Sequence, residues 1–172
     1  MIWSKTKKAL EALLADSVKG HVHFYVTRYG PGDSHTMNRG WITWDGKEVA
    51  SFSNIVHWQA VMAVADALRV THQDQPGNRF RDYTAAAETT VAESQAILSR
   101  DNFDDAIDRY LTLSIDEALN DADPIIRAIA MLDRRLGKRR LKEIVVDDQT
   151  HFLVKQLYTR RCEAESLPVV YK

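Results

Sequence analysis

WITWDGKEVASFS, residues 41–53, decides the fold class of this chain. Two runs rich in aromatic and β-branched residues flank Asp45-Gly46, a pair typical of type I′ turns, in which both central residues take positive φ. The stretch therefore predicts a β-hairpin. A three-residue turn with a bulge after Gly46 is the competing register, and it would change which residues face Trp44.

Upstream of the hairpin, the chain predicts one more strand and one helix. Residues 21–29 alternate between apolar and polar side chains, with Val22 and Phe24 on the same face of a strand. Residues 3–16 carry apolar side chains at helical spacing, and Ser4 stands where an N-cap is needed. A helix followed by three antiparallel strands is therefore expected.

Downstream of the hairpin, the period of the apolar residues changes to that of a helix. From Asn54 to Leu68 these residues recur at helical spacing with apolar neighbours, which predicts a largely buried helix that covers the sheet. The polar stretch 71–79 marks the expected subdomain boundary. Beyond it, Ser114 with Glu117 predicts a capping box.

These patterns together predict an α+β fold. Its order is an N-terminal helix, a three-stranded antiparallel sheet, a covering helix and an all-helical C-terminal half. We expect a single domain over residues 1–172, with an α/β-meander subdomain at 1–70 and a helical subdomain at 80–172.

Composition narrows the class of protein. The 172 residues are 45% hydrophobic and 27% charged, with 23 basic and 24 acidic side chains, so a basic field over the whole surface is not expected. A single cysteine, Cys162, allows no internal disulfide and no zinc site made of cysteines alone, which fits a reducing cytosol. No long apolar run suggests a signal peptide or a membrane span. We expect a cytoplasmic protein that does not bind membranes.

Charge is segregated along the chain. Residues 82–123 contain eleven acidic and two basic side chains, whereas residues 124–142 contain seven basic side chains and one acidic. One interpretation is that acidic helix starts and basic helix ends neutralise each other within the fold. In this view Asp133-Arg134-Arg135 forms a buried ionic cluster at a helix corner. The other interpretation is a surface for a protein partner of complementary charge.

A protein-binding surface would use the tryptophans of the hairpin and the acidic stretch. Trp41 and Trp44 lie three apart on one strand and so face opposite sides of the sheet. One belongs to the core, and the other is either an interface anchor or is covered by the C-terminal helices. The candidate partner-binding residues are Trp41, Trp44, Asp104, Asp105 and Asp108.

Two other kinds of site remain open. A nucleic-acid interface would use the basic segment, namely Arg134, Arg135, Lys138, Arg139, Arg140 and Lys142. A metal-dependent enzyme would use His21 and His23, on one face of a strand, with His57.

No catalytic residue is singled out. The arginines beside Cys162 would lower the pKa of its thiol, yet a lone helical cysteine is more typical of a core. We therefore lean against an enzyme, expect no cofactor, and leave a homodimer open.

Three stretches carry a family resemblance. They are residues 2–8 (IWSKTKK), residues 114–141 (SIDEALN to LDRRLGKRRL) and residues 161–165 (RCEAE). Together they resemble an uncharacterised family of small bacterial cytosolic proteins. The resemblance implies a bacterial, cytosolic protein and transfers no activity. With the segregated charge, it favours a non-enzymatic protein-binding module, of the kind that immunity or antitoxin proteins supply.

Overall fold

The computed structural model of the chain contains helices and one sheet whose contacts group into two compact units. The described residues are 2–27, 38–68 and 79–170. The first unit comprises Met1–Tyr25, Trp41–Ala50 and Phe103–Lys172, and the second comprises Val26–Gly40 and Ser51–Asn102.

The predicted hairpin is confirmed together with its register. Strands β2 (Arg39–Trp44) and β3 (Lys47–Ser53) end directly at the turn. Asp45 has φ 49° and Gly46 has φ 74°, so both central residues lie in the left-handed region that a type I′ turn requires. The bulged alternative is therefore wrong.

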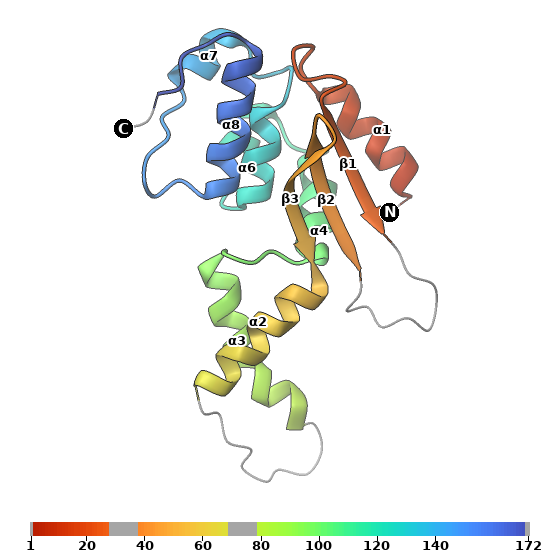
Figure 1. Cartoon of the computed structure of the whole chain (residues 1–172), viewed down its shortest axis with the longest axis vertical. Coiled ribbons are helices and arrows are strands. Elements are labelled where there is room, and N and C mark those ends of the chain that lie inside the picture. The colour runs from red at the N-terminus through yellow and green to blue at the C-terminus, as the bar shows by residue number, and fades with distance from the viewer. Residues whose placement is uncertain (1, 28–37, 69–78, 171–172) are drawn as a thin grey trace. The chain divides into compact units, whose positions relative to one another are not determined.

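The third strand, β1 (Val22–Thr27), pairs with β2, which makes the sheet order β1-β2-β3 (Figure 1). Alternation along the strands divides the side chains between the two faces. Val22, Phe24 and Ile42 are fully buried and share one face with Trp44, which is 9% exposed. The α+β prediction, with an N-terminal helix, an antiparallel three-stranded sheet and then helices, is confirmed.

Helix α1 (Trp3–Leu13) is shorter than the expected span of 3–16, and Ser4 is not its N-cap. Ile2 holds that position and makes no side-chain capping bond. The helix ends early because Leu14 turns to extended backbone and forms a bridge with Asp133. The Ala15 amide then donates to the Leu132 carbonyl at 2.9 Å instead of continuing the helix.

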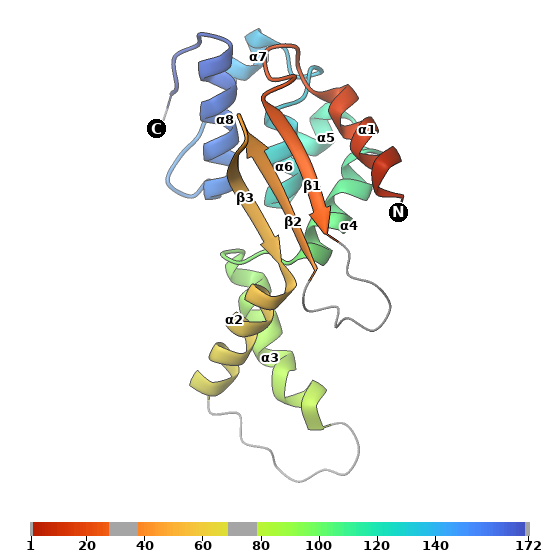
Figure 2. The ribbon, with the colours of Figure 1, turned by 45° about the vertical axis from the view of Figure 1, so that its right-hand side comes forward.

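Helix α6 (Pro124–Met131) is almost wholly buried within the first unit. Asp123 caps α6 by accepting from the Ile125 amide, and the Ser114–Glu117 capping box opens α5 as predicted. Helix α6 packs against both α5 and α8 (Figure 2). The bounds of the other helices are α4 Arg100–Tyr110, α5 Ile115–Leu119, α7 Lys138–Glu143 and α8 Phe152–Ala164.

The second unit is built on a helix pair, α2 (Asn54–Ala67) and α3 (Arg79–Ser94). Val61 and Ala65 of α2 are its only buried residues, and they cluster with two residues of α3. The expectation that this helix is largely buried is thus wrong. Helix α2 carries apolar side chains on all its sides. Helix α3, against which it packs, covers one side only, and apolar residues elsewhere, such as Leu68 at the helix end, stay exposed.

The expected boundary at 71–79 falls almost wholly outside the described residues, so the single-domain organisation stays a prediction. Among the described helices, none combines the length and the apolar character needed to cross a membrane.

Candidate functional site

Helix α8 divides its side chains between the core and an exposed stripe. It begins after His151, whose ring Nδ1 accepts from the Leu153 amide at 3.2 Å. Leu153, Leu157 and Tyr158 face inward, because the helical period places them on one side. The complete buried set is Leu153, Val154, Leu157, Tyr158, Arg161 and Cys162.

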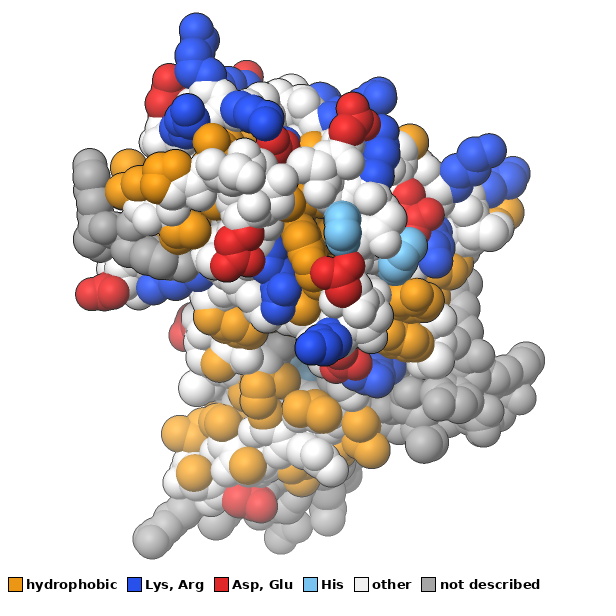
Figure 3. All heavy atoms as spheres, turned by 45° about the horizontal axis from the view of Figure 1, so that its top comes forward, with side chains coloured by type: hydrophobic (Ala, Val, Ile, Leu, Met, Phe, Trp, Pro, Cys, Tyr) orange, Lys and Arg blue, Asp and Glu red, His pale blue; other side chains and the backbone are white. Residues whose placement is uncertain are grey.

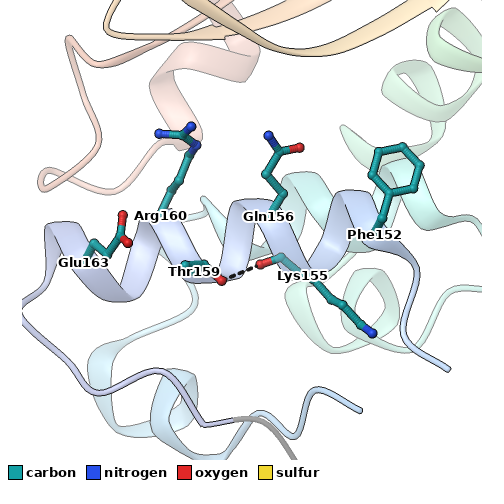
Figure 4. A pocket seen from close by; sticks show the side chains of 6 residues that line it. All are labelled: Phe152, Lys155, Gln156, Thr159, Arg160 and Glu163. Atoms are coloured by element: carbon teal, nitrogen blue, oxygen red, sulfur yellow. Dashed lines mark hydrogen bonds between the residues drawn. The ribbon is translucent and has the colours of Figure 1, made fainter. Parts of the chain in front are cut away.

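The other side of α8 lines an open groove of about 720 Å³, which we call the α8 groove (Figure 4). The 3.6-residue period places Phe152 and Glu163 near the middle of the exposed stripe, with Lys155 and Arg160 on its two flanks. Figure 4 shows Lys155 and Arg160 pointing to opposite sides of the helix. The lining residues are Phe152, Lys155, Gln156, Thr159, Arg160 and Glu163.

Arg160 is the best-positioned polar group in the α8 groove. Its guanidinium carbon lies 5.6 Å from the centroid of the Trp44 ring, which holds the side chain by a cation–π contact. Its Nε is buried and donates to no acceptor within the described part of the chain, and no carboxylate there lies within ion-pair distance. Burying an N–H donor without an acceptor costs free energy. A carboxylate supplied by a ligand would accept from this donor and remove that cost.

Trp44 is itself fixed from another side. Its ring stacks with that of His21 at a centroid distance of 5.9 Å and an interplanar angle of 19°. The Nδ1 of His21 lies 2.6 Å from the Asp45 carboxylate of the hairpin turn. The sequence-predicted partner-binding residue Trp44 is therefore a largely buried support for Arg160.

The ends of the α8 groove differ in chemistry. Phe152 is 57% exposed, and its ring lies 4.6 Å from that of His151. Lys155 donates to the Asp148 carbonyl at 3.2 Å and has no carboxylate partner among the described residues. Glu163 supplies an exposed acidic group beyond Arg160. The groove thus presents an apolar end, two cations and an acidic end.

Behind the groove, a buried network fixes α8 to the first unit. Arg161, 2% exposed, donates to the Leu132 carbonyl at 3.2 Å and pairs with Glu165 at 2.9 Å. Burial raises the pKa of the Glu165 carboxyl, but hydrogen bonds from Lys138 (2.7 Å) and Ser17 (2.6 Å) and the charge of Arg161 outweigh it and lower the pKa overall. The backbone that carries the groove is therefore anchored.

The ionic cluster predicted at the helix corner is confirmed for Asp133, which is 1% exposed, and Arg135, whereas Arg134 is exposed and lies outside it. Asp133 accepts from Nε of Arg135 at 3.0 Å, from its terminal nitrogen at 2.8 Å, and from the Tyr110 hydroxyl. Burial and the contact with Asp133 raise the pKa of Tyr110 well above its ordinary value. The hydrogen bond to Asp133 likewise raises the pKa of Arg135.

Ion pairs within the fold neutralise several side chains of the basic segment. Arg135 binds Asp133, Lys138 pairs with Glu165, and Arg140 pairs with Asp116. Of the nucleic-acid candidates, the exposed Arg134, Arg139 and Lys142 have no such ion pair in the described residues. The face displayed in Figure 3 accordingly shows basic and acidic side chains interspersed.

The opposite tryptophan, Trp41, lies on the other face of the sheet and is partly exposed. It stacks on Tyr25 at 5.2 Å, and the Lys7 ammonium lies 4.6 Å from the Tyr25 ring centroid. His23 points to the same side, with Nδ1 3.6 Å from Glu11 of α1. Aromatic stacking thus covers part of Trp41, and the alternation predicted for the two tryptophans is confirmed.

The acidic candidates lie on α4. Asp105 and Asp108 are exposed, and Asp104 is partly buried. They belong to the first unit, as Trp41 and Trp44 do.

The proposed metal ligands are not brought together in the part of the chain that the structure describes. No group of three or more histidine, cysteine, aspartate or glutamate side chains there could hold a metal ion. His21 and His23 each face their own carboxylate, and His57 belongs to the second unit.

Cys162 is buried in the core at 1% exposure. Burial raises the pKa of its thiol and outweighs the lowering effect of Arg161. The alternative of an arginine-activated thiolate is therefore wrong.

Comparison with known proteins places the chain in a family. A model of the SF0329 protein family matches residues 2–162. The chain belongs to this family. The SF0329 family is uncharacterised, in agreement with the resemblance carried by the sequence. No curated protein and no solved structure matches the chain.

Sequence reasoning missed the α8 groove. It assigned no role to the outward residues of this helix. One signal was available, because Phe152 is a large aromatic residue that falls outside the buried stripe. The contact between Arg160 and Trp44 had no such signal, since the two residues are far apart in the chain.

Proposed function

We propose that this SF0329 family member is a non-enzymatic protein-binding module whose partner docks in the α8 groove. The observation that carries the proposal is Arg160, which is held on Trp44 with a buried donor unsatisfied. Arginine and aromatic side chains dominate the binding energy of protein interfaces, particularly where they are desolvated in advance. Exposed Phe152 adds an apolar anchor on the same helix face.

The chemistry of the groove fits a polypeptide better than a nucleic acid. Its two cations are flanked by an apolar group at one end and an acidic group at the other, whereas a nucleic-acid site needs several cations along one phosphate backbone. The exposed Asp105 and Asp108 supply a second feature, an acidic surface that would speed the encounter with a basic partner region.

The proposal includes the setting that the sequence suggested. We place the protein in the bacterial cytosol and its role among immunity- or antitoxin-like proteins, on the strength of the family resemblance and the reduced, buried Cys162.

A paired affinity capture tests the proposal. Tagged wild-type protein, Arg160→Glu and the control Arg139→Glu are incubated with bacterial lysate, each with and without nuclease. Arg139 is exposed on α7 and lies outside the groove, so its reversal changes net charge equally without touching the site. Far-UV circular dichroism confirms that each variant is folded.

We expect one protein to be retained by the wild type and by Arg139→Glu, with or without nuclease, and to be lost with Arg160→Glu. Retention that disappears after nuclease treatment, or that is equal for both reversals, would contradict the proposal.

A further inference from the structure

The α8 groove also indicates which part of a protein it selects. We propose that it binds an extended acidic segment in which an apolar side chain contacts Phe152 and carboxylates pair with Lys155 and Arg160. This inference rests on the proposed function and names the chemistry of the partner.

The argument begins with charge. Lys155 and Arg160 are the cations of the groove, and neither has a carboxylate within ion-pair distance in the described chain. This sets them apart from the basic side chains that are already neutralised, such as Arg140 on Asp116. Arg160 also keeps its buried Nε without an acceptor. Carboxylates are the groups that pair best with a fixed guanidinium.

The distance between the two cations indicates the conformation of the bound segment. Lys155 and Arg160 are five positions apart on α8, which is about 7.5 Å along the helix axis at 1.5 Å per residue. An extended chain rises about 3.3 Å per residue, so side chains three positions apart, which point to opposite sides, cover that distance. Because the two cations lie on opposite flanks of the stripe, an extended segment between them can direct alternate side chains to each.

The two ends of the groove give the segment a direction. Phe152 accepts an apolar side chain three residues before Lys155, and Glu163 repels a carboxylate three residues beyond Arg160. Acidic residues of the segment are therefore favoured where they lie above Lys155 and Arg160, and disfavoured where they would lie beside Glu163. The preferred segment has one apolar residue at the Phe152 end next to two or three acidic residues over the cations.

We would test this inference by adding each probe to the full chain and following the NMR signals of the backbone amides and of the tryptophan indole N–H groups. The probes are the peptide acetyl-SLSEEES-amide, the charge-reversed acetyl-SLSKKKS-amide and a single-stranded oligothymidylate of eight nucleotides. We expect the acidic peptide alone to shift signals of α8 and the indole of Trp44. Its binding should weaken as salt is raised, because the contact is between charges.

Variants make the test specific. Arg160→Gln should weaken binding of the acidic peptide about tenfold to a hundredfold, the usual worth of a hydrogen bond to a charged group. Arg139→Gln, outside the groove, should leave it unchanged. Glu163→Gln should tighten binding severalfold, since it removes the repelling charge. That gain cannot come from misfolding.

Equal shifts from the lysine peptide, tighter binding of the oligonucleotide, or no shift at millimolar acidic peptide would each overturn this inference. If the affinity capture still returned a protein that depends on Arg160, the proposed function would stand and only the acidic chemistry would fall.

Discussion

Replacing Asp133 with alanine should destabilise the protein by about 3–5 kcal/mol, because the substitution leaves buried donors without their acceptor. The carboxylate receives the amide of Arg135 at 2.7 Å, two bonds from the guanidinium of Arg135, and the hydroxyl of Tyr110. The Asp133 side chain is 0% exposed. The side chain of Arg135 is 31% exposed and regains some hydration, which favours the lower end of the range.

Urea unfolding followed by circular dichroism measures this cost from the midpoint and slope. The control is Asp105→Ala, an exposed acid on α4, which should change the free energy of unfolding by less than about 0.5 kcal/mol. A loss of less than about 1 kcal/mol for Asp133→Ala, with the slope unchanged, would refute the assignment of the cluster as a main stabilising element.

Tyr110→Phe separates the hydroxyl from the ion pair. It should cost about 1.5–3 kcal/mol at neutral pH, the range for a hydrogen bond to a charged group. It should also change how the free energy of unfolding depends on pH above about pH 10. The pKa of Tyr110 is raised in the folded state, so the unfolded chain loses this proton first, near pH 10. The contribution of the protonated Tyr110 hydroxyl to the free energy of unfolding is therefore fully present below about pH 10 and is lost as the pH rises above 10.

The wild type should consequently lose up to about 1.4 kcal/mol per pH unit above pH 10 from this residue alone. Tyr110→Phe should lack that component, and the difference between the two curves isolates it from the titration of lysines. Parallel curves above pH 10 would show that Tyr110 is not the buried donor described here.

Two further predictions concern the turn and the thiol. Gly46→Ala should cost about 1–2 kcal/mol in thermal unfolding because a Cβ is strained at φ 74°. Gly137→Ala, at φ −71° with equally open space around it, loses only the N-cap preference of glycine over alanine and should cost less. Equal effects would argue against the type I′ turn. Cys162 should resist a thiol-specific disulfide reagent in the native protein and react fully in urea, followed by absorbance, since burial both shields it and raises its pKa; rapid native labelling would contradict its place in the core.

Features set by neighbouring residues were predictable from the sequence. Asp45-Gly46 determines its turn through backbone sterics, and Ser114 with Glu117 determines a helix start through two short hydrogen bonds. The ion pair between Asp133 and Arg135 was also within reach, because the two opposite charges lie two positions apart at a helix corner.

Features set by distant residues were not predictable. Helix α1 ends at Leu13 because Leu132 and Asp133 offer backbone partners to the residues that follow it. The burial of α2 depends on how much of its apolar surface α3 contacts, which periodicity does not encode. The α8 groove depends on Trp44 lying beneath Arg160, a contact between a strand and the last helix.

The first unit is assembled from three pieces of chain, and this has a consequence for how a ribosome delivers it. Residues near Leu14 take their backbone partners from Leu132 to Arg134, and Ser17 binds Glu165 close to the last helix end. As synthesis runs from the N-terminus, Leu14 to Ser17 emerge long before these partners in residues 132–165. The nascent first unit cannot close until α8 has left the exit tunnel, so its closure is a late step in the folding of this chain.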